Sequence, residues 1–539
     1  MGPRKFREGE RKSSNSTDGA FDVMPVAGAG VGGGLVELEL ELAMAQREEK
    51  NVVIFPFMAQ GHLIPFLALA FQIEQRKGYT VTLVNTPLNI KKLRSSLPPN
   101  TTIRLAELPF CSADHGLPPH SENTDVLPHP LIIRLLESTI SLKPSFKSLI
   151  SDLTLNQNLL CIIADMFFGW TVDIAYEFGV FHSFFISAGA YGTAIFFSLL
   201  LHLPQHETDS DDEFSLPDFP QVSRIHSSQL PYYLKNTDGD SNSWSIFLKR
   251  EFLQWLNSDG LLVNTVEDLD QPGLQYFRRT TNRPVWSIGP TLSSMARPLP
   301  SKEAAGISPD FCLEWLDNHP PASVIYVSFG SQNRVSASQM MELAMALDAS
   351  GKNFIWVVRP PVGFDIGSEF RAGEWLPEGF EGRMKDCNRG LLVRKWAPQL
   401  EILAHKSTGA FVSHCGWNSV LESLSHGVPI IGWPMAAEQF FNAKLLEEEI
   451  GVCVEVARGN ECEVRHEEIA RVIELVMNGG DKGEEMRRKA CEVKEIIKDS
   501  IRDDDEGFKG SSVKAMDDFF DEALSMKKTK ERENQNKIP

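Results

Sequence analysis

The chain has 539 residues, 42% of them hydrophobic, and a formal net charge of −19 at pH 7. This length and apolar content suffice for two large α/β domains. The negative charge argues against nucleic acid as a partner, because little in the chain would neutralise a phosphate backbone. The eight cysteines form no C-x-x-C pair, which favours reduced thiols over disulfides or a metal site.

Residues 1–49 are predicted to be a disordered N-terminal extension, because a polar, basic stretch is followed by a glycine-rich one. No apolar core of a secretory signal is present there. The letters from Gly28 to Gly33 match the G-x-G-x-x-G dinucleotide fingerprint. The segment before them contains Pro25 and is too short for a central strand, so we do not interpret the match as a nucleotide site.

Residues 50–290 alternate short apolar runs with helical stretches, which predicts a parallel sheet with crossover helices. A segment at 291–308, rich in Ser, Pro and Ala, is predicted to be a linker. The expected strands of this half are Asn51–Phe55, Thr80–Asn85, Thr102–Leu105, Leu159–Ala164, His182–Ile186 and Gly260–Asn264.

Phe184 to Leu201 forms an apolar run of 18 residues without a charge, the length of a membrane span. Ser187-Ala-Gly189 divides this run. We therefore expect a strand followed by a buried helix of one domain.

His62 and Asp165 are candidates for acid–base chemistry in this half. His62 lies in the loop after the first strand, where a helix begins, and the helix dipole there favours a neutral ring that can accept a proton. Asp165 ends another strand and faces the same edge of the sheet. It could bind the second ring nitrogen and stabilise the charged ring. A helix cap or a packed side chain is the structural alternative for each residue.

Several apolar side chains near these positions predict a pocket for a lipophilic acceptor, although they could equally belong to the core. They are Phe57, Met58, Phe167, Phe168 and Tyr191.

Two D-x-D sequences, Asp209-Ser-Asp211 and Asp238-Gly-Asp240, match a metal-binding motif by letter. Both lie in acidic, serine-rich loops and not directly after an apolar strand. We interpret them as solvated loops and expect no metal.

Residues 309–509 repeat the alternation of strands and helices and predict a second domain of the same kind. Its expected strands are Val324–Phe329, Asn353–Val358, Gly390–Lys395, Gly409–Ser413 and Val428–Gly432.

The stretch from Trp396 to Gln439 contains the groups needed to bind a nucleotide sugar. A strand ending at Ser413 leads into a polar turn and a helix over Val420–Ser425, and the free N–H groups of such a junction suit a diphosphate. Gly416 permits close approach of the backbone. Glu422 lies one helical turn further and suits a ribose.

This stretch resembles the signature box of plant UDP-dependent glycosyltransferases, and the resemblance covers roughly Lys50 to Asp521. It implies the GT-B fold: α/β, with two Rossmann-like domains whose parallel sheets face a cleft. It also implies a C-terminal helix at 510–525 that packs back on the N-terminal domain. Residues 526–539 are predicted to be a disordered tail.

The resemblance assigns roles to individual residues. The implied catalytic residues are His62 and Asp165. The implied UDP-binding residues are Ser331, Trp396, Ala397, Gln399, His414, Gly416, Asn418, Ser419 and Glu422. The implied sugar-binding residues are Trp417, Glu438 and Gln439.

The resulting hypothesis is a cytoplasmic, monomeric enzyme that transfers a hexose, glucose in first place, from a UDP-sugar to a hydroxyl of a small lipophilic plant metabolite. Direct displacement would invert the anomeric carbon and give a β-glucoside. No cofactor, metal or membrane insertion is expected, since the UDP-sugar is a co-substrate. Two alternatives stay open: a nucleotide-sugar epimerase and a non-catalytic UDP-sugar binder.

Overall fold

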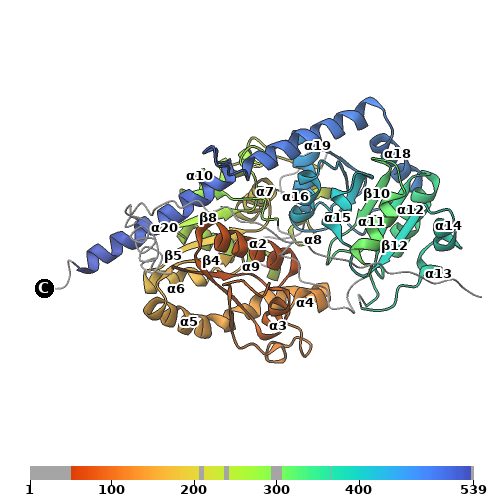
Figure 1. Cartoon of the computed structure of the whole chain (residues 1–539). Helices are drawn as coiled ribbons and strands as arrows, with labels where there is room; N and C mark the ends of the chain where they lie inside the picture. The colour runs from red at the N-terminus through yellow and green to blue at the C-terminus, as the bar shows by residue number, and fades with distance from the viewer. Residues whose placement is uncertain (1–49, 205–211, 236–241, 293–305, 366, 536–539) are drawn as a thin grey trace, which may run out of the picture. The chain divides into compact units, whose positions relative to one another are not determined.

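The computed structural model describes residues 50–204, 212–235, 242–292, 306–365 and 367–535. These residues form two parallel sheets with helices packed around them (Figure 1). We call residues 50–292 the N-terminal half and residues 306–510 the C-terminal half. The prediction of an α/β fold with two Rossmann-like parallel sheets is confirmed.

The N-terminal half contains a seven-stranded parallel sheet in the order β3-β2-β1-β4-β5-β8-β9. Its strands are β1 (Asn51–Phe55), β2 (Thr80–Asn85), β3 (Arg104–Glu107), β4 (Leu159–Asp165), β5 (Phe181–Ile186), β8 (Gly260–Val263) and β9 (Val285–Ser287). Its helices are α2 (Gln60–Lys77), α3 (Pro87–Ser96), α4 (His129–Ser138), α5 (Lys143–Asn156), α6 (Thr171–Phe178), α7 (Ala190–His202), α8 (Tyr232–Lys235), α9 (Ser243–Gln254) and α10 (Gln271–Thr281). A small antiparallel hairpin joins β6 (Glu213–Phe214) and β7 (Ile225–His226).

The C-terminal half contains a six-stranded parallel sheet in the order β12-β11-β10-β13-β14-β15. Its strands are β10 (Val324–Ser328), β11 (Asn353–Val358), β12 (Gly390–Arg394), β13 (Thr408–Ser413), β14 (Ile430–Gly432) and β15 (Cys453–Glu455). Its helices are α11 (Pro309–Asp317), α12 (Ala337–Ala349), α13 (Ala372–Trp375), α14 (Phe380–Asp386), α15 (Gln399–Ala404), α16 (Trp417–Ser425), α17 (Gln439–Lys444), α18 (His466–Met477) and α19 (Asp481–Ser500).

Both faces of each sheet are buried, which explains why the strands are continuous apolar runs. In β1, Val53 and Phe55 join one hydrophobic cluster while Val52 and Ile54 join the other. Neighbouring strand residues point to opposite faces, so each face of the sheet carries its own core.

The order of the strands reverses once in each sheet, and these reversals position the loops discussed below. In the N-terminal sheet the reversal lies between β1 and β4, which pair with Phe55 opposite Ala164. In the C-terminal sheet it lies between β10 and β13, which pair with Ser328 opposite Ser413. Ligands of open α/β sheets gather at such switch points, outside the carboxyl ends of the strands.

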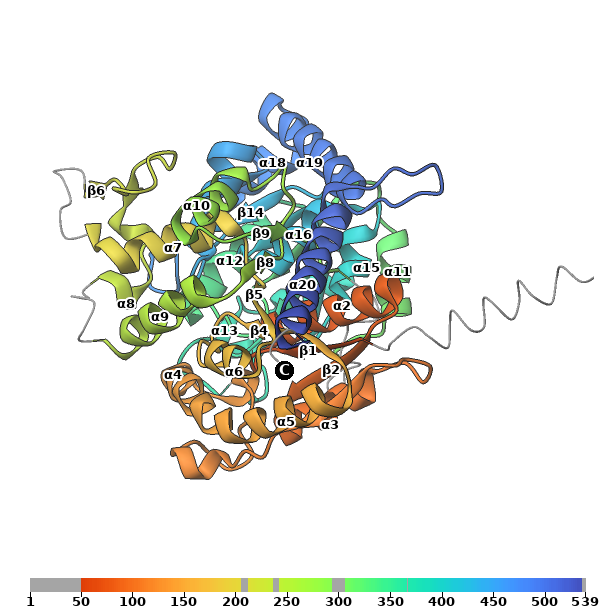
Figure 2. The same cartoon turned by 90° about the vertical axis from the view of Figure 1, so that its left-hand side faces the viewer.

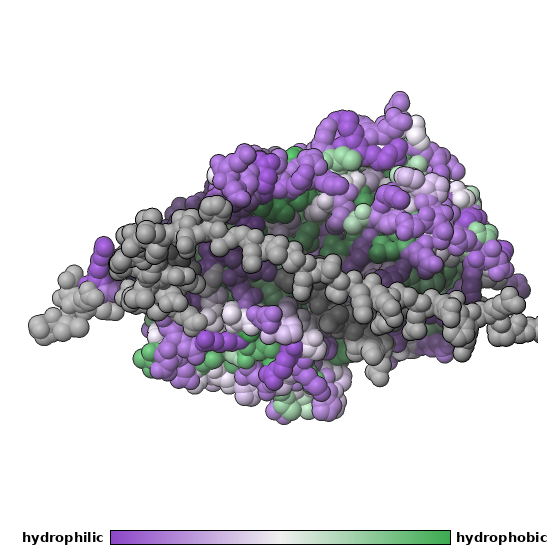
Figure 3. All heavy atoms as spheres, viewed as in Figure 1, coloured by the Kyte–Doolittle hydropathy of each residue, from purple (hydrophilic) through white to green (hydrophobic). Residues whose placement is uncertain are grey.

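The apolar run at 184–201 is divided as predicted, into β5 and the buried helix α7. Within the described residues, no helix is long and apolar enough to cross a membrane. On the face drawn in Figure 3, hydrophilic side chains predominate and hydrophobic ones show in smaller patches.

Helix α20 (Ser511–Gln535) follows α19 and lies against the sheet of the N-terminal half, beside β4, β5 and β9 (Figures 1 and 2). The Phe519 ring packs 5.2 Å from Trp286 and 5.7 Å from Phe181, measured between centroids. The helix continues beyond the predicted end at Ser525, so a disordered tail from 526 is wrong up to Gln535. Hydrogen bonds to the N-terminal half stabilise this extra length of helix, because Lys527 donates to the Leu159 carbonyl and Lys530 to the Gly179 carbonyl.

The predicted strands all occur, with small shifts at their ends. The largest shifts are two residues, at β3, which begins at Arg104 and not at Thr102, and at β14, which begins at Ile430 and not at Val428. Two edge strands of three residues, β9 and β15, were not predicted, because such short runs carry little periodic signal.

Candidate active site

The first turn of α2 and the end of β4 bring His62 and Asp165 together at the switch point of the N-terminal sheet, so His62 lies within the helix and not in the loop before it. His62 Nδ1 lies 2.8 Å from Asp165 Oδ2. The Asp165 side chain is fully buried, whereas 18% of the His62 side chain is exposed. The ring therefore has a buried partner on one side and an accessible edge on the other.

Backbone donors fix the orientation of Asp165. The Phe57 N–H donates to Oδ2 at 3.1 Å and the Phe167 N–H donates to Oδ1 at 3.2 Å. A carboxylate only accepts hydrogen bonds, so His62 Nδ1 carries the hydrogen and Nε2 keeps its lone pair. The arrangement is that of a general base held by a carboxylate.

Aromatic side chains flank this base. The rings of Phe57 and Phe167 lie 5.6 and 5.2 Å from the His62 ring, between centroids. Met58, Phe168 and Tyr191 are at most 1% exposed and lie within the core. Of the five apolar residues predicted to form the acceptor pocket, Phe57 and Phe167 therefore contact the base.

A serine that the sequence analysis did not assign also reaches the base. Ser187 Oγ lies 3.4 Å from His62 Nδ1. This residue directly follows β5, so the rule that ligands gather at carboxyl ends of strands could have identified it.

In the C-terminal half, the turn after β13 holds His414 between two glycines. A Cβ atom on Gly330 would lie 2.7 Å from His414 Nε2, and one on Gly416 would lie 2.3 Å from it. Both positions therefore require glycine, and at Gly330 the positive φ of 75° adds to this requirement. The helix begins at Trp417, three residues earlier than predicted.

His414 is neutral at physiological pH. Burial lowers the pKa of His414 to about 4, and the charge of Arg359 lowers it further in the same direction. No hydrogen-bond partner of its Nδ1 occurs among the described residues. A neutral ring beside the first turn of α16 can donate one hydrogen bond to an anion there.

Gln399, at the start of α15, contacts two other predicted UDP-binding residues, Ser419 and Glu422. Its Nε2 donates to Glu422 Oε2 at 2.6 Å and to Ser419 Oγ at 3.0 Å. Tyr326 OH donates to Gln399 Oε1 at 3.1 Å. Trp396 and Ala397 precede Gln399 in the sequence. Trp396 is 39% exposed, and Ala397 is buried. The geometry suits these predicted contacts, which stay predictions.

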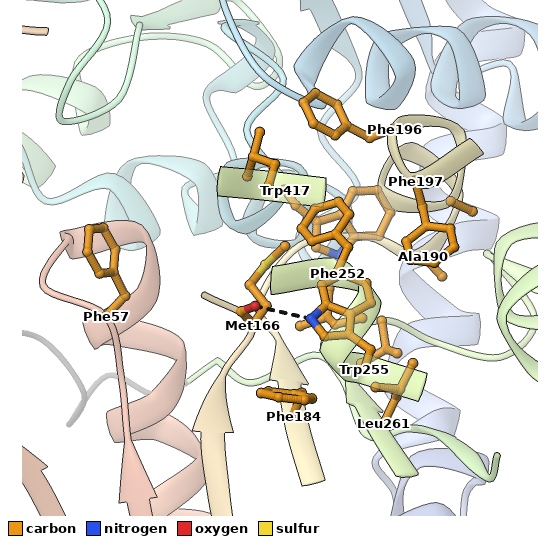
Figure 4. Packing of buried hydrophobic residues seen from close by; sticks show 14 of the residues in the cluster. Phe57, Met166, Phe184, Ala190, Phe196, Phe197, Phe252, Trp255, Leu261 and Trp417 are labelled. Carbon is orange, nitrogen blue, oxygen red and sulfur yellow. Dashed lines mark hydrogen bonds between the residues drawn. The ribbon is translucent and has the colours of Figure 1, made fainter. Parts of the chain in front are cut away.

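The side chains of Trp417 and Asn418 form hydrogen bonds with residues of the N-terminal half, which were not predicted. The Trp417 indole is 3% exposed and donates to the Asn264 carbonyl at 2.6 Å. It belongs to a buried hydrophobic cluster that contains residues of both halves (Figure 4). The Asn418 amide donates to the Gly61 carbonyl at 2.8 Å and accepts from Asn264 Nδ2 at 3.3 Å.

Both side chains thus connect the two halves, and the contacts of Trp417 with the sugar and of Asn418 with UDP stay predictions. Asn264 was not assigned from the sequence. It directly follows β8, where the strand-end rule again applies.

Glu438 and Gln439 lie at the start of α17, as the strand-end rule predicts. Burial raises the pKa of Glu438, and the charge of His62 opposes this shift. Glu438 is therefore close enough to the base to feel its charge across the boundary between the halves. Gln439 Oε1 accepts from the N–H groups of Met435 and Ala436 at 3.2 and 3.0 Å.

Within the described residues, no group of three or more His, Cys, Asp or Glu side chains could hold a metal ion. Both D-x-D sequences and the Gly28–Gly33 segment lie outside the described residues. Metal-independent chemistry stays a prediction.

Two family models match the chain. Residues 48–292 match "Glycosyltransferase, N-terminal domain" and residues 308–490 match "UDP-glucoronosyl and UDP-glucosyl transferase". UDP-glycosyltransferase 92A1 of Arabidopsis thaliana is 48% identical over 492 residues, covering 90% of this chain and 99% of the relative. The chain belongs to the plant UDP-glycosyltransferases.

Two further similarities extend over most of this glycosyltransferase. Crocetin glucosyltransferase 3 of Crocus sativus is 47% identical over 453 residues, covering 79% of this chain and 90% of the relative. A Glycyrrhiza uralensis glycosyltransferase solved with glycyrrhetinic acid 3-O-monoglucuronide superposes with a TM-score of 0.77 and 30% identity, covering 90% of this chain and 98% of that one. The GT-B fold and the enzyme class are thereby confirmed.

Proposed function

We propose that this UDP-glycosyltransferase transfers glucose from UDP-glucose to a hydroxyl of a small lipophilic plant metabolite and yields a β-glucoside. The hydrogen bond between His62 and the buried Asp165 carries the proposal, because it leaves one ring nitrogen accessible as a base. The names of the Crocus relative and of the matched family support glucose as the donated sugar.

The proposed reaction is one displacement. His62 Nε2 takes the proton of the acceptor hydroxyl, and the oxygen attacks the anomeric carbon from the face opposite the diphosphate. The bond from that carbon to the diphosphate oxygen breaks, and its electron pair leaves with UDP. The proton stays on His62, where the Asp165 carboxylate offsets the new charge. A single displacement without a protein nucleophile inverts the anomeric centre.

The acceptor is proposed to lie against the Phe57 and Phe167 rings, which flank the base. The UDP moiety would then occupy the region of Trp396, Gln399 and the first turn of α16. Neither the matched family models nor the relatives named above support the epimerase or the non-catalytic binder. Metal independence, the monomeric state and the cytoplasmic location stay predictions.

Incubation of the protein with UDP-glucose and a mixed panel of aglycones tests the proposal, with products identified by mass and anomeric configuration by NMR. The expected product is a β-glucoside, and the His62→Gln variant should form almost none while still binding UDP. An altered free nucleotide sugar, or an α-linked product, would contradict the proposal.

A further inference from the structure

The predicted diphosphate site has few full positive charges of its own. His414 is neutral because burial lowers its pKa to about 4. The first turn of α16 offers backbone N–H groups, whose dipole amounts to about half a charge, and side chains without a charge. The chain as a whole carries a net charge of −19. A cation close to the turn would therefore change donor binding substantially.

Arg359 directly follows β11 and lies at the same sheet edge as the turn. β11 pairs with β10, and β10 pairs with β13, all in parallel. The loops after these three strands are therefore adjacent. The Arg359 Nη1 donates to the Ser331 carbonyl in the loop after β10. Through Gly330, that loop in turn contacts the His414 ring.

Among the described residues, the hydrogen bond to the Ser331 carbonyl uses one of the N–H donors of the Arg359 guanidinium, and the others can bind a ligand. Burial lowers the pKa of Arg359, and among the described residues no carboxylate oxygen lies within the 4.0 Å ion-pair distance. A guanidinium has five N–H donors in a fork that matches phosphate oxygens. Its charge already acts on His414, whose pKa it lowers.

The negative charge that acts most strongly on Arg359 comes from the N-terminal half. Asp125 lies in a short helical turn at Thr124–Val126, and its charge raises the pKa of Arg359. Gln60 donates to Asp125 Oδ2 at 2.8 Å, while Oδ1 is buried and has no hydrogen-bond partner among the described residues. Asp125 therefore balances Arg359 from a distance and does not neutralise it.

We propose that Arg359 binds the diphosphate of the UDP-sugar and supplies the positive charge that the turn after β13 lacks. This inference rests on the proposed function. The alternative is a structural role, in which Arg359 only braces the Ser331 loop through its carbonyl. The two differ in whether the residue distinguishes a charged ligand from an uncharged one.

Calorimetric titration with UDP and with uridine, without acceptor, tests the proposal on the full chain. Arg359→Gln should weaken UDP binding roughly 10- to 100-fold, as expected for hydrogen bonds to a charged group, and uridine binding less than about 2-fold. Arg359→Lys keeps the positive charge but loses the paired N–H donors of the guanidinium. Its UDP affinity should therefore lie between that of the parent and that of Arg359→Gln.

Arg334→Gln is the matched control. Arg334 lines the same small hollow as Arg359, but it donates to the Pro361 and Phe364 carbonyls at 3.5 and 2.6 Å, and the negative charge that acts on it is that of Asp365. Its UDP and uridine affinities should stay within about 2-fold of the parent.

Equal weakening of UDP and uridine in Arg359→Gln would overturn the proposal in favour of a bracing role, and an unchanged UDP affinity would overturn it outright. If Arg359→Gln does not fold, Arg359→Lys decides: it must weaken UDP and spare uridine. These titrations need no turnover. A parent protein that binds UDP but forms no glucoside would refute the proposed function and leave this result intact.

Discussion

Replacing Asp165 by Asn changes one atom of the dyad and almost none of its volume. Three N–H groups point at the carboxylate: His62 Nδ1 at 2.8 Å, Phe57 N at 3.1 Å and Phe167 N at 3.2 Å. An amide has one accepting atom and one donating atom. If the amide oxygen serves His62 and Phe57, its NH2 meets the Phe167 N–H and two donors face each other.

The opposite orientation of the amide moves the conflict to the Phe57 N–H, which lies 3.1 Å from the Oδ2 position, and it disables the base. The NH2 group then faces His62 Nδ1, which must become an acceptor, so the hydrogen moves to Nε2. A ring with Nε2–H cannot take a proton from the acceptor hydroxyl. We expect kcat to fall roughly 10²- to 10⁴-fold, which corresponds to about 3–5 kcal/mol of transition-state stabilisation.

Steady-state kinetics with UDP-glucose and one identified aglycone measure this loss. The KM for UDP-glucose should change less than about 3-fold, because the predicted UDP contacts lie in the other half of the chain. The His62→Gln, Asp165→Asn double variant should be no slower than His62→Gln alone, since the two residues act as a unit. An Asp165→Asn variant with more than half the parent kcat, or multiplicative losses in the double variant, would refute the reasoning.

Three further changes probe other parts of the site and the core. Trp396→Ala should raise the Kd of UDP roughly 10- to 100-fold in titrations if the indole stacks on uracil, with little change in stability because the side chain is 39% exposed; an unchanged Kd would exclude the stacking. Trp417→Phe should lower the free energy of unfolding by about 1–3 kcal/mol in denaturant titrations, because the Asn264 carbonyl loses a buried donor. His182 is neutral when folded, since burial lowers its pKa to about 3. The unfolded chain therefore binds the extra proton below pH 6.5, and the parent loses stability there as pH falls. Urea titrations at pH 7 and pH 5 should show His182→Phe gaining about 2 kcal/mol relative to the parent at the lower pH, and a pH-independent difference would contradict a neutral buried ring.

The sheets could be predicted because parallel strands buried on both faces are written as continuous apolar runs. That signal found β1 and β10 with nearly correct ends, and it located Asp165 and Ser331 at carboxyl ends of strands. The signal weakens at the edges of a sheet, where strands are short. It also could not set the end of α20, which depends on lysines that bind the carbonyls of Leu159 and Gly179, far away in the sequence.

The site was predicted less completely, because chain proximity does not say which half a side chain faces. Trp417 and Asn418 stand between residues suited to a nucleotide, yet both reach across to Asn264. Ser187 and Asn264 stand in ordinary turns and carry no local motif. Their places directly after β5 and β8 follow the strand-end rule, but only the structure shows that they contact His62 and Asn418.

This packing gives the first turn of α16 two functions that do not compete. The side chains of Trp417 and Asn418 bind the N-terminal half, and the Asn418 amide reaches the carbonyl of Gly61, the residue before His62. The backbone N–H groups of the same turn have no partners within the helix and can face a ligand. A donor bound there is therefore positioned by the same turn that contacts the first turn of α2, which carries the base. For a donor bound at this turn, the distance between the sugar and His62 would depend on one helix end, whose Trp417 and Asn418 side chains are already fixed on the N-terminal half.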